Sequence, residues 1–294
     1  MQDNKRDRQI KRGLVLEGGA MRGMFTSGIL DVFLEKGISF DGAVGVSAGA
    51  TFGCNFKSRQ AGRAIRYNKR FSHDWRYCSV RSLILTGDLY GASFCYDEIP
   101  NKLDPFDYES YRANPMEFYC VASDCNTGKP VYKKLESCDK DELTWMRASA
   151  SMPLASGIVK IDGYSLLDGG MTDSVPLRFF EGLGYNRNVV ILTQPRDFRK
   201  EASSLMWLMK LALAKYPEAV NAMRRRPEVY NEEVADVFAK ADRGELLVIC
   251  PERSLGISRT EKDTGELQRV YDEGRRVAAA RLDEVRTFLE EQEQ

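Results

Sequence analysis

The chain has 294 residues, of which 43% are hydrophobic and 29% charged, and its 43 basic and 43 acidic side chains leave no formal net charge. This composition is ordinary for a globular protein with a sizeable core, and the absence of net charge argues against a nucleic-acid binder with an overall basic field. The seven cysteines are an odd number and form no CxxC pair, so they give no support for a zinc or thioredoxin-like site and indicate reduced thiols in the cytoplasm.

The sequence lacks signals for secretion or membrane insertion. Residues 1–11 predict a polar tail without the apolar segment of a signal peptide. The longest apolar stretch, 205–214, has about half of the ~20 residues that a membrane-spanning helix needs. We therefore expect a cytoplasmic protein without a transmembrane segment, and the sequence leaves peripheral contact with a membrane open.

The first third of the chain alternates strand and helix patterns. Apolar runs at 13–17 and 40–46 predict buried strands, and the helical spacing of apolar residues predicts a helix over 24–36. This order is typical of a parallel sheet with helices on its faces. Residues 61–116 show no clean period in their later part and predict mixed helix and loop that forms a wall over a cleft.

The rest of the chain adds strands and then long helices. Strands are predicted at 117–123, 130–135, 158–161, 164–167, 188–193 and 246–250. Helices are predicted over 139–150, 205–214 and 265–290. The sequence therefore predicts an α/β fold with a mainly parallel central sheet, organised as a polar tail (1–11), a main domain (12–250) and a helical C-terminal extension packed on it (251–294).

Two later segments have two interpretations each. The stretch 205–214 is apolar almost all round, which favours a buried helix, with a lid or an interfacial helix as the alternative. The cluster Arg224 to Arg226, before Pro227, favours a solvated helix end, with contact to anionic lipid headgroups as the alternative.

A serine between two glycines follows the second predicted strand. In the run Gly45-Val46-Ser47-Ala48-Gly49, the strand, the tight turn and the small residues behind it are typical of a nucleophile elbow. Such a turn has no room for side chains at Gly45 and Gly49, and it pushes the Ser47 hydroxyl into a cleft. The alternative is a glycine-rich turn whose serine caps the following helix.

A second glycine-rich turn, Gly18-Gly19-Ala20-Met21-Arg22-Gly23, follows the first predicted strand. Its backbone N–H groups can point at one anion, either a phosphate or the oxyanion of a tetrahedral acyl intermediate. Ala20 stands where a dinucleotide-binding fingerprint needs glycine. Both glycine-rich turns lie at the carboxyl ends of their strands and face one crevice, so the oxyanion interpretation fits with Ser47 whereas the phosphate interpretation leaves Ser47 unexplained.

A nucleophilic serine needs a base, and the chain has a single histidine, His73. In a serine–acid–histidine triad of an α/β-hydrolase, the histidine follows the acid near the end of the chain, and this sequence has no histidine after residue 73. A surface or capping role is therefore favoured for His73. The run Asp168-Gly169-Gly170 places a carboxylate at a sharp turn directly after a predicted strand. By itself this run is equally compatible with an ordinary Asp-Gly turn, but Asp168 is the best-placed partner for Ser47.

Taken in this order, the three motifs resemble those of the patatin-like phospholipase family, and the small-residue stretch 148–153 before Asp168 resembles the family as well. The resemblance covers roughly residues 12–195, with a looser extension to about 250. It implies a Ser-Asp dyad in which Ser47 is the nucleophile and Asp168 the base, and in which residues 18–23 form the oxyanion hole.

Two positions of the glycine-rich motif bear on this resemblance. Arg22 matches a basic position of the family, and Ala20 replaces a glycine found in many members but keeps an N–H group. The resemblance implies a serine esterase or lipid acyl hydrolase, of phospholipase or lysophospholipase type, that acts on lipid or other ester substrates without a metal or other cofactor. An acyltransferase or thioesterase with the same dyad, and a non-catalytic acyl- or lipid-binding protein on this fold, remain alternatives.

Overall fold

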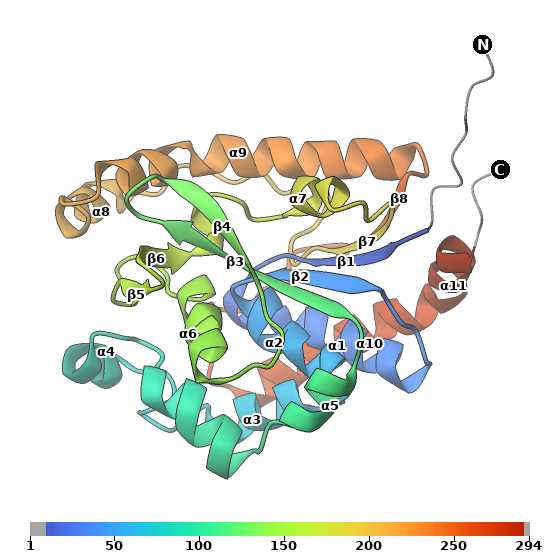
Figure 1. The fold of residues 1–294 in the computed structure, drawn as a ribbon, viewed down its shortest axis with the longest axis horizontal. Helices are drawn as coiled ribbons and strands as arrows, with labels where there is room; N and C mark the ends of the chain where they lie inside the picture. The colour runs from blue at the N-terminus through green and yellow to red at the C-terminus, as the bar shows by residue number, and fades with distance from the viewer. Residues whose placement is uncertain (1–9, 291–294) are drawn as a thin grey trace.

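The computed structural model describes residues 10–290, and the polar tail predicted for 1–11 lies almost entirely outside this range. The described residues form one mixed sheet with helices on both faces (Figure 1). The strands lie in the order β5-β6-β3-β2-β1-β7-β8, and β4 pairs with β3. Their bounds are β1 (Arg12–Leu16), β2 (Gly42–Val46), β3 (Glu117–Asp124), β4 (Lys129–Lys134), β5 (Val159–Ile161), β6 (Tyr164–Asp168), β7 (Arg187–Ile191) and β8 (Leu246–Ile249).

The sheet confirms the predicted fold class. Strands β3, β2, β1, β7 and β8 run parallel to one another, whereas β4 and β6 pair antiparallel with β3, and β5 pairs antiparallel with β6. In β1, Leu14 and Leu16 join the core on one face of the sheet and Val15 joins the core on the other. A strand buried on both faces is expected to be a continuous apolar run, which is the pattern that predicted these strands.

The helices form two layers. Their bounds are η1 (Ala20–Arg22), α1 (Gly23–Glu35), α2 (Ala48–Lys57), α3 (Arg63–Phe71), α4 (Val80–Thr86), η2 (Phe94–Leu103), α5 (Tyr108–Ala113), α6 (Lys140–Ser149), η3 (Gly169–Met171), α7 (Leu177–Gly182), α8 (Met206–Ala212), α9 (Pro217–Asp242), α10 (Thr264–Ala280) and α11 (Leu282–Glu290). Helices α1, α2, α3 and α10 cover one face, and α7 and α9 cover the other (Figure 1). None of the helices within residues 10–290 is both long and apolar enough to cross a membrane.

Helices α1 and α10 touch along their backbones. A Cβ atom added to Gly28 would lie 2.1 Å from the Tyr271 carbonyl oxygen, and one added to Gly274 would lie 2.0 Å from the Phe25 carbonyl oxygen. Only glycine fits at either position, since real Cβ atoms do not approach so closely. The C-terminal helices are thus packed directly on the first helix of the chain, while the predicted boundary at residue 250 stays a prediction.

The single helix predicted for 265–290 is wrong, because the chain breaks between α10 and α11 at Arg281. The Arg281 guanidinium hydrogen-bonds the Val248 carbonyl of β8 and the Glu284 carboxylate. The change of direction lets α11 bury Val285 and Leu289. The apolar stripe continues across the break, so its periodicity gave no sign of it.

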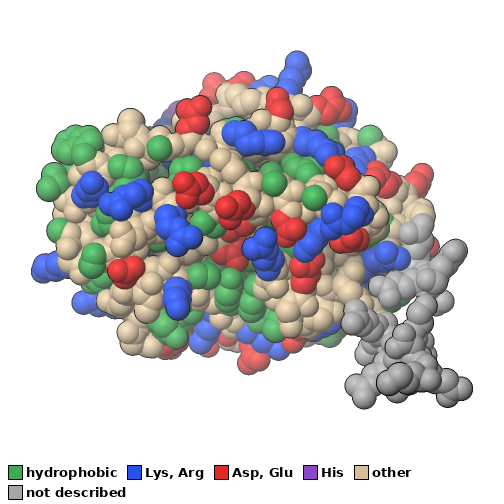
Figure 2. Space-filling model, turned by 90° about the horizontal axis from the view of Figure 1, so that it is seen from above, with side chains coloured by type: hydrophobic (Ala, Val, Ile, Leu, Met, Phe, Trp, Pro, Cys, Tyr) green, Lys and Arg blue, Asp and Glu red, His purple; other side chains and the backbone are tan. Residues whose placement is uncertain are grey.

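The segment 205–214 is not the buried helix that its composition favoured. Helix α8 is short and buries Met209, while Trp207 is 63% exposed and Leu211 is 67% exposed. Figure 2, seen from the side of α9, shows hydrophobic side chains gathered at the end of the molecule where α8 lies in Figure 1. An apolar composition all round a helix does not reveal that one side of it lacks a packing partner, and among residues 10–290 nothing covers the side of α8 that carries Trp207 and Leu211.

The arginine cluster also differs from its prediction, because Arg224 to Arg226 lie within α9 and not at a helix end. Pro227 removes one helical hydrogen bond, but α9 continues because residues such as Tyr230 and Val234 are buried on its inner side. Arg224 and Arg225 are exposed, whereas Arg226 turns toward the sheet and its Nε donates to the Gly170 carbonyl at 2.5 Å.

Candidate active site

Ser47 lies in a strained turn between β2 and α2, with a φ of 53° and a ψ of −120°. Serine rarely adopts a positive φ, and such conformations cluster at functional sites. A Cβ atom on Gly45 would lie 2.5 Å from the Ala50 nitrogen, and one on Gly49 would lie 2.4 Å from the Leu16 carbonyl oxygen. The turn therefore needs glycine on both sides of Ser47.

The Ser47 side chain makes no capping hydrogen bond with α2, so the capping alternative is not what the structure contains. The Ser47 backbone N–H instead donates to the Ser149 hydroxyl at 2.9 Å, across 102 residues of sequence. Ser149 is fully buried at the end of α6, within the small-residue stretch 148–153. This hydrogen bond ties the serine turn to the segment that leads to Asp168.

Asp168 ends β6, where its carboxylate accepts from the Gly170 N–H at 2.8 Å and borders the same cavity as Ser47. The two residues meet because β3 lies between β2 and β6 in the sheet. Asp168 is 6% exposed, and this burial raises the pKa of its carboxyl group, while the neighbouring Ser47 hydroxyl and the charge of Arg226 lower it. A buried carboxylate of raised pKa is a stronger base than one in water.

The glycine-rich turn packs against the serine, since a Cβ atom on Gly18 would lie 3.0 Å from Ser47 Cβ. Ala20 has a φ of 49°, a conformation that suits glycine better. Within residues 10–290, no acceptor binds the N–H groups of 18–21. The N–H groups of Arg22 and Gly23 are already bonded inside the turn, so 18–21 supply the unengaged donors of the predicted oxyanion hole.

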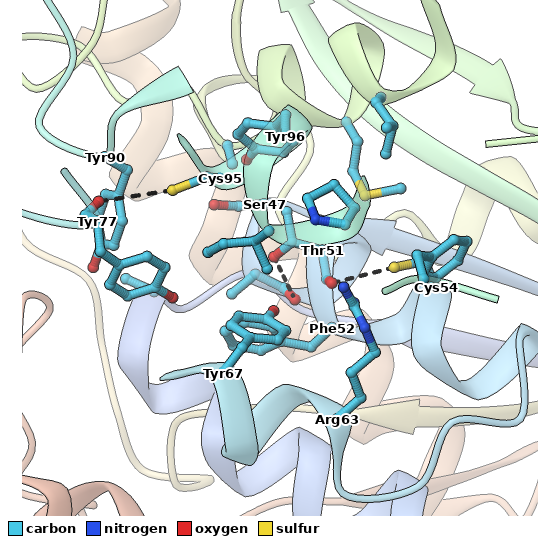
Figure 3. Close-up of a pocket in the computed structure, with 18 of the residues that line it drawn as sticks. Ser47, Thr51, Phe52, Cys54, Arg63, Tyr67, Tyr77, Tyr90, Cys95 and Tyr96 are labelled. Atoms are coloured by element: carbon cyan, nitrogen blue, oxygen red, sulfur yellow. Dashed lines mark hydrogen bonds between the residues drawn. The ribbon is translucent and has the colours of Figure 1, made fainter. Parts of the chain in front are cut away.

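Two cavities meet at Ser47. One, of about 120 Å³, has a mostly apolar and aromatic lining that includes Phe52, Tyr67, Tyr96 and Met146. Figure 3 shows these tyrosine and phenylalanine rings gathered around the cavity that Ser47 borders. The other, of about 600 Å³, is lined by Asp168, the glycine-rich turn and residues of the C-terminal half of the chain.

The second cavity contains charged residues that the sequence motifs did not indicate, namely Glu17, Lys200, Glu201 and Arg259. They lie beside Arg22 of the glycine-rich turn and Arg226 of the arginine cluster. Glu17 is an acidic residue at the end of an apolar strand, directly before Gly18, and this position could have marked it as a candidate site residue. Lys200 and Arg259 lie in loops without any local pattern. His73 is exposed and lines neither cavity.

No group of three or more His, Cys, Asp or Glu side chains within the described range could hold a metal ion. The groups that surround Ser47 in the larger cavity are the Asp168 carboxylate, the backbone of the glycine-rich turn and cationic side chains.

Comparisons with known proteins agree with this geometry. Residues 14–180 match the family model described as patatin-like phospholipase, and residues 216–290 match a model described as a domain of unknown function, DUF6363. The chain is 28% identical over 198 residues to the uncharacterized protein YjjU of Escherichia coli, covering 62% of this chain and 52% of that protein. It is 30% identical over 180 residues to lysophospholipase nte1 of Aspergillus terreus, covering 58% of this chain and 11% of that protein.

The chain thus spans about half of the bacterial relative and about a tenth of the fungal one. The solved structure of VipD from Legionella pneumophila aligns with a TM-score of 0.42 at 13% identity, covering 92% of this chain and 67% of that one. The patatin-like model alone matches more than half of the present sequence. The chain belongs to the patatin-like phospholipase family.

Proposed function

We propose that this protein is a serine esterase that cleaves carboxylic esters of lipids, with Ser47 as nucleophile and Asp168 as general base. The observation that carries the proposal is the meeting of the strained Ser47 turn and the buried Asp168 carboxylate at one cavity, beside the glycine-rich turn with its unengaged backbone N–H groups. The lysophospholipase names of the fungal relatives support a lipid ester as the substrate class.

The proposed reaction has two steps. Asp168 takes the Ser47 proton as Oγ bonds to the ester carbonyl carbon, and the N–H groups of 18–21 stabilise the resulting oxyanion. When the tetrahedral intermediate collapses, the bond to the alcohol breaks and the Asp168 carboxyl returns the proton to the leaving oxygen. Water then gives a proton to Asp168 and attacks the acyl-enzyme, which releases the fatty acid and restores the Ser47 hydroxyl.

The apolar cavity of about 120 Å³ supports the assignment of the acyl side of the site. Its aromatic and aliphatic lining suits a hydrocarbon chain, because apolar surface leaves water on binding. We propose that the acyl chain enters between α2, η2 and α6, whose residues line this cavity.

Helix α8 supports peripheral contact with a lipid surface. Leu205 and Met209 line the larger cavity, while Trp207 and Leu211 on the same segment are exposed. Exposed tryptophan and leucine side chains are typical of segments that lie in the interface of a bilayer. We propose that this segment brings the site to the surface from which its substrate comes.

Labelling with a fluorophosphonate probe tests the dyad. We expect the wild-type protein to be labelled and Ser47→Ala to remain unlabelled, and we expect Asp168→Asn to be labelled far more slowly with its thermal unfolding temperature little changed. Hydrolysis of p-nitrophenyl esters of increasing chain length should show an optimum set by the apolar cavity. A folded wild type that takes no label and cleaves no ester would contradict the proposal and favour the binding-protein alternative.

The acyl acceptor separates an acyltransferase from a hydrolase, and the leaving group separates a thioesterase from an esterase. An acyltransferase or thioesterase with the same dyad would take the fluorophosphonate label equally. Product analysis would then distinguish them, since a transferase passes the acyl group from Ser47 to an added alcohol or amine in preference to water. Hydrolysis that predominates in the presence of such acceptors is the outcome we expect.

A further inference from the structure

Four cationic side chains line the larger cavity beside the dyad: Arg22, Lys200, Arg226 and Arg259. None of them forms an ion pair with a carboxylate in the described part of the chain, whereas arginines elsewhere pair closely, as Arg275 does with Glu35 at 2.8 Å. The Nε of Arg22 is buried without any hydrogen-bond partner. Buried charges and donors without partners are costly, so this arrangement is suited to a ligand that supplies the missing anion.

The acidic side chains of the cavity form no ion pair with these cations within residues 10–290, although the charges of Glu17 and Asp168 act on Arg22 and Arg226 from nearby. Glu17 accepts from the Thr193 backbone N–H at 2.5 Å and from the Tyr230 hydroxyl at 2.8 Å. The Asp168 carboxylate accepts from the Gly170 N–H at 2.8 Å.

Glu201 is the remaining carboxylate of the lining; it is exposed and makes no ion pair with the four cations. The inner acids are thus held by neutral donors, which leaves the cationic groups available to an incoming anion.

The position of the cations relative to the reacting atoms suggests which part of a substrate they meet. Ser47 borders both cavities, with the apolar cavity on one side and the cationic one on the other. Arg226 donates to the Gly170 carbonyl in the acid turn, and Arg22 lies in the glycine-rich turn. An ester whose carbonyl sits at Ser47 with its acyl chain in the apolar cavity would direct its alcohol part toward the cations.

Building on the proposed function, we propose that this cationic cavity binds the phosphate group on the alcohol part of a lipid ester, which makes a phosphate-bearing acylglycerol the preferred substrate. Guanidinium and ammonium groups are the usual protein partners of phosphate. Lys200, Arg226 and Arg259 lie outside residues 14–180, the part of the chain that matches the patatin-like model. The headgroup side of the site is therefore supplied by the C-terminal half of this protein.

The test compares two short-chain substrates that stay monomeric and share one acyl chain, a monoacylglycerol and the corresponding acylglycerol 3-phosphate. The comparison is made at about pH 6, where a lysine amine is still protonated even when burial lowers its pKa moderately. The variants are Lys200→Gln and Arg259→Gln, and the matched control is Arg225→Gln, which removes an exposed charge from the same helix as Arg226.

We expect the wild type to favour the phosphate-bearing substrate in kcat/KM. Lys200→Gln should lower this preference by about 10- to 100-fold, the effect of losing a hydrogen bond to a charged group, and Arg259→Gln should lower it in the same direction. Arg225→Gln should leave the preference as it is in the wild type. A wild type without the preference, or one whose preference survives both cavity substitutions, would overturn the inference.

Binding by the Ser47→Ala protein separates this inference from the proposed hydrolysis, because it needs no turnover. Calorimetry should show tighter binding of the acylglycerol 3-phosphate than of the monoacylglycerol, and the difference should disappear when Lys200→Gln is added. Binding of inorganic phosphate with no advantage for the lipid phosphate would overturn the headgroup assignment in favour of a free-phosphate site. Equal binding of both lipids would overturn the inference even if ester hydrolysis is found.

Discussion

Replacing Ser149 with alanine tests how the strained turn at Ser47 is maintained. The buried Ser149 hydroxyl accepts the Ser47 backbone N–H at 2.9 Å, and no other acceptor for that N–H occurs within residues 10–290. Alanine removes the acceptor without adding bulk. The Ser47 N–H would then be buried without a partner, and the φ of 53° would have to be maintained by packing alone.

The expected loss of stability follows from the lost hydrogen bond to Ser149 and from the strained backbone of Ser47. A buried N–H without a partner costs about 1–3 kcal/mol, and a backbone conformation of the Ser47 type costs of order 1–3 kcal/mol that the surroundings must offset. We expect Ser149→Ala to lower the free energy of unfolding by about 1–3 kcal/mol, which for a chain of this size lowers Tm by roughly 2–5 °C. Displacement of the Ser47 hydroxyl should reduce kcat by about ten- to a hundredfold.

Thermal unfolding followed by circular dichroism, and the rate of fluorophosphonate labelling, measure both effects. Ser151→Ala is the matched control, because Ser151 is also buried but its hydroxyl donates to the Arg147 carbonyl of α6, the helix that ends just before it. That carbonyl also accepts the Ala150 N–H, so the control leaves no backbone group without a partner. Equal losses of Tm and labelling rate in the two variants would refute the reasoning.

Two further substitutions test features away from the dyad. Trp207→Ser should slow hydrolysis of esters in vesicles by about tenfold and hydrolysis of a soluble short-chain ester much less, because the exposed indole contributes only at a lipid surface; equal losses on both substrates, or the same vesicle effect in the exposed control Leu183→Ser, would remove the interfacial role. Glu233 is partly buried beside Asp173, and this burial and the neighbouring carboxyl raise its pKa from 4.5 to about 8. Since the folded state then retains a proton that the unfolded state loses, this group makes stability fall as pH rises from about 4.5 to about 8. Glu233→Gln should remove that decline and raise the free energy of unfolding near the upper end of this range by about 1–3 kcal/mol, and urea melts with the same pH dependence in both proteins would contradict this.

The fold was predictable where one local pattern determines one element. Runs such as 13–17 and 188–193 predict strands because a parallel strand buried on both faces must be continuously apolar. The proximity of Ser47 and Asp168 was predictable from their motifs, because Gly45, Gly49 and Gly169 meet backbone atoms that leave no room for a side chain. Gly169 is an example, since an added Cβ atom would lie 2.2 Å from the Val121 carbonyl oxygen.

What the sequence did not reveal depends on contacts between distant segments. Lys200 and Arg259 reach the cavity from loops, and neither has neighbours in sequence that mark it. The break at Arg281 depends on a carbonyl in β8, and the exposure of Trp207 depends on which side of α8 meets another element. Hydrophobic periodicity records that a residue is apolar and says nothing about what packs against it.

The backbone contact between α1 and α10 has a consequence for how the protein can be divided. A fragment cut to the patatin-like region would lose the helix that Gly28 and Gly274 bring against α1, and it would lose β7, which pairs with β1 in the interior of the sheet. Such a fragment would present a bare sheet edge and an uncovered apolar helix, both of which favour aggregation. The region that sequence similarity assigns to the family is therefore shorter than the smallest part of this protein that can fold, which extends well past residue 180.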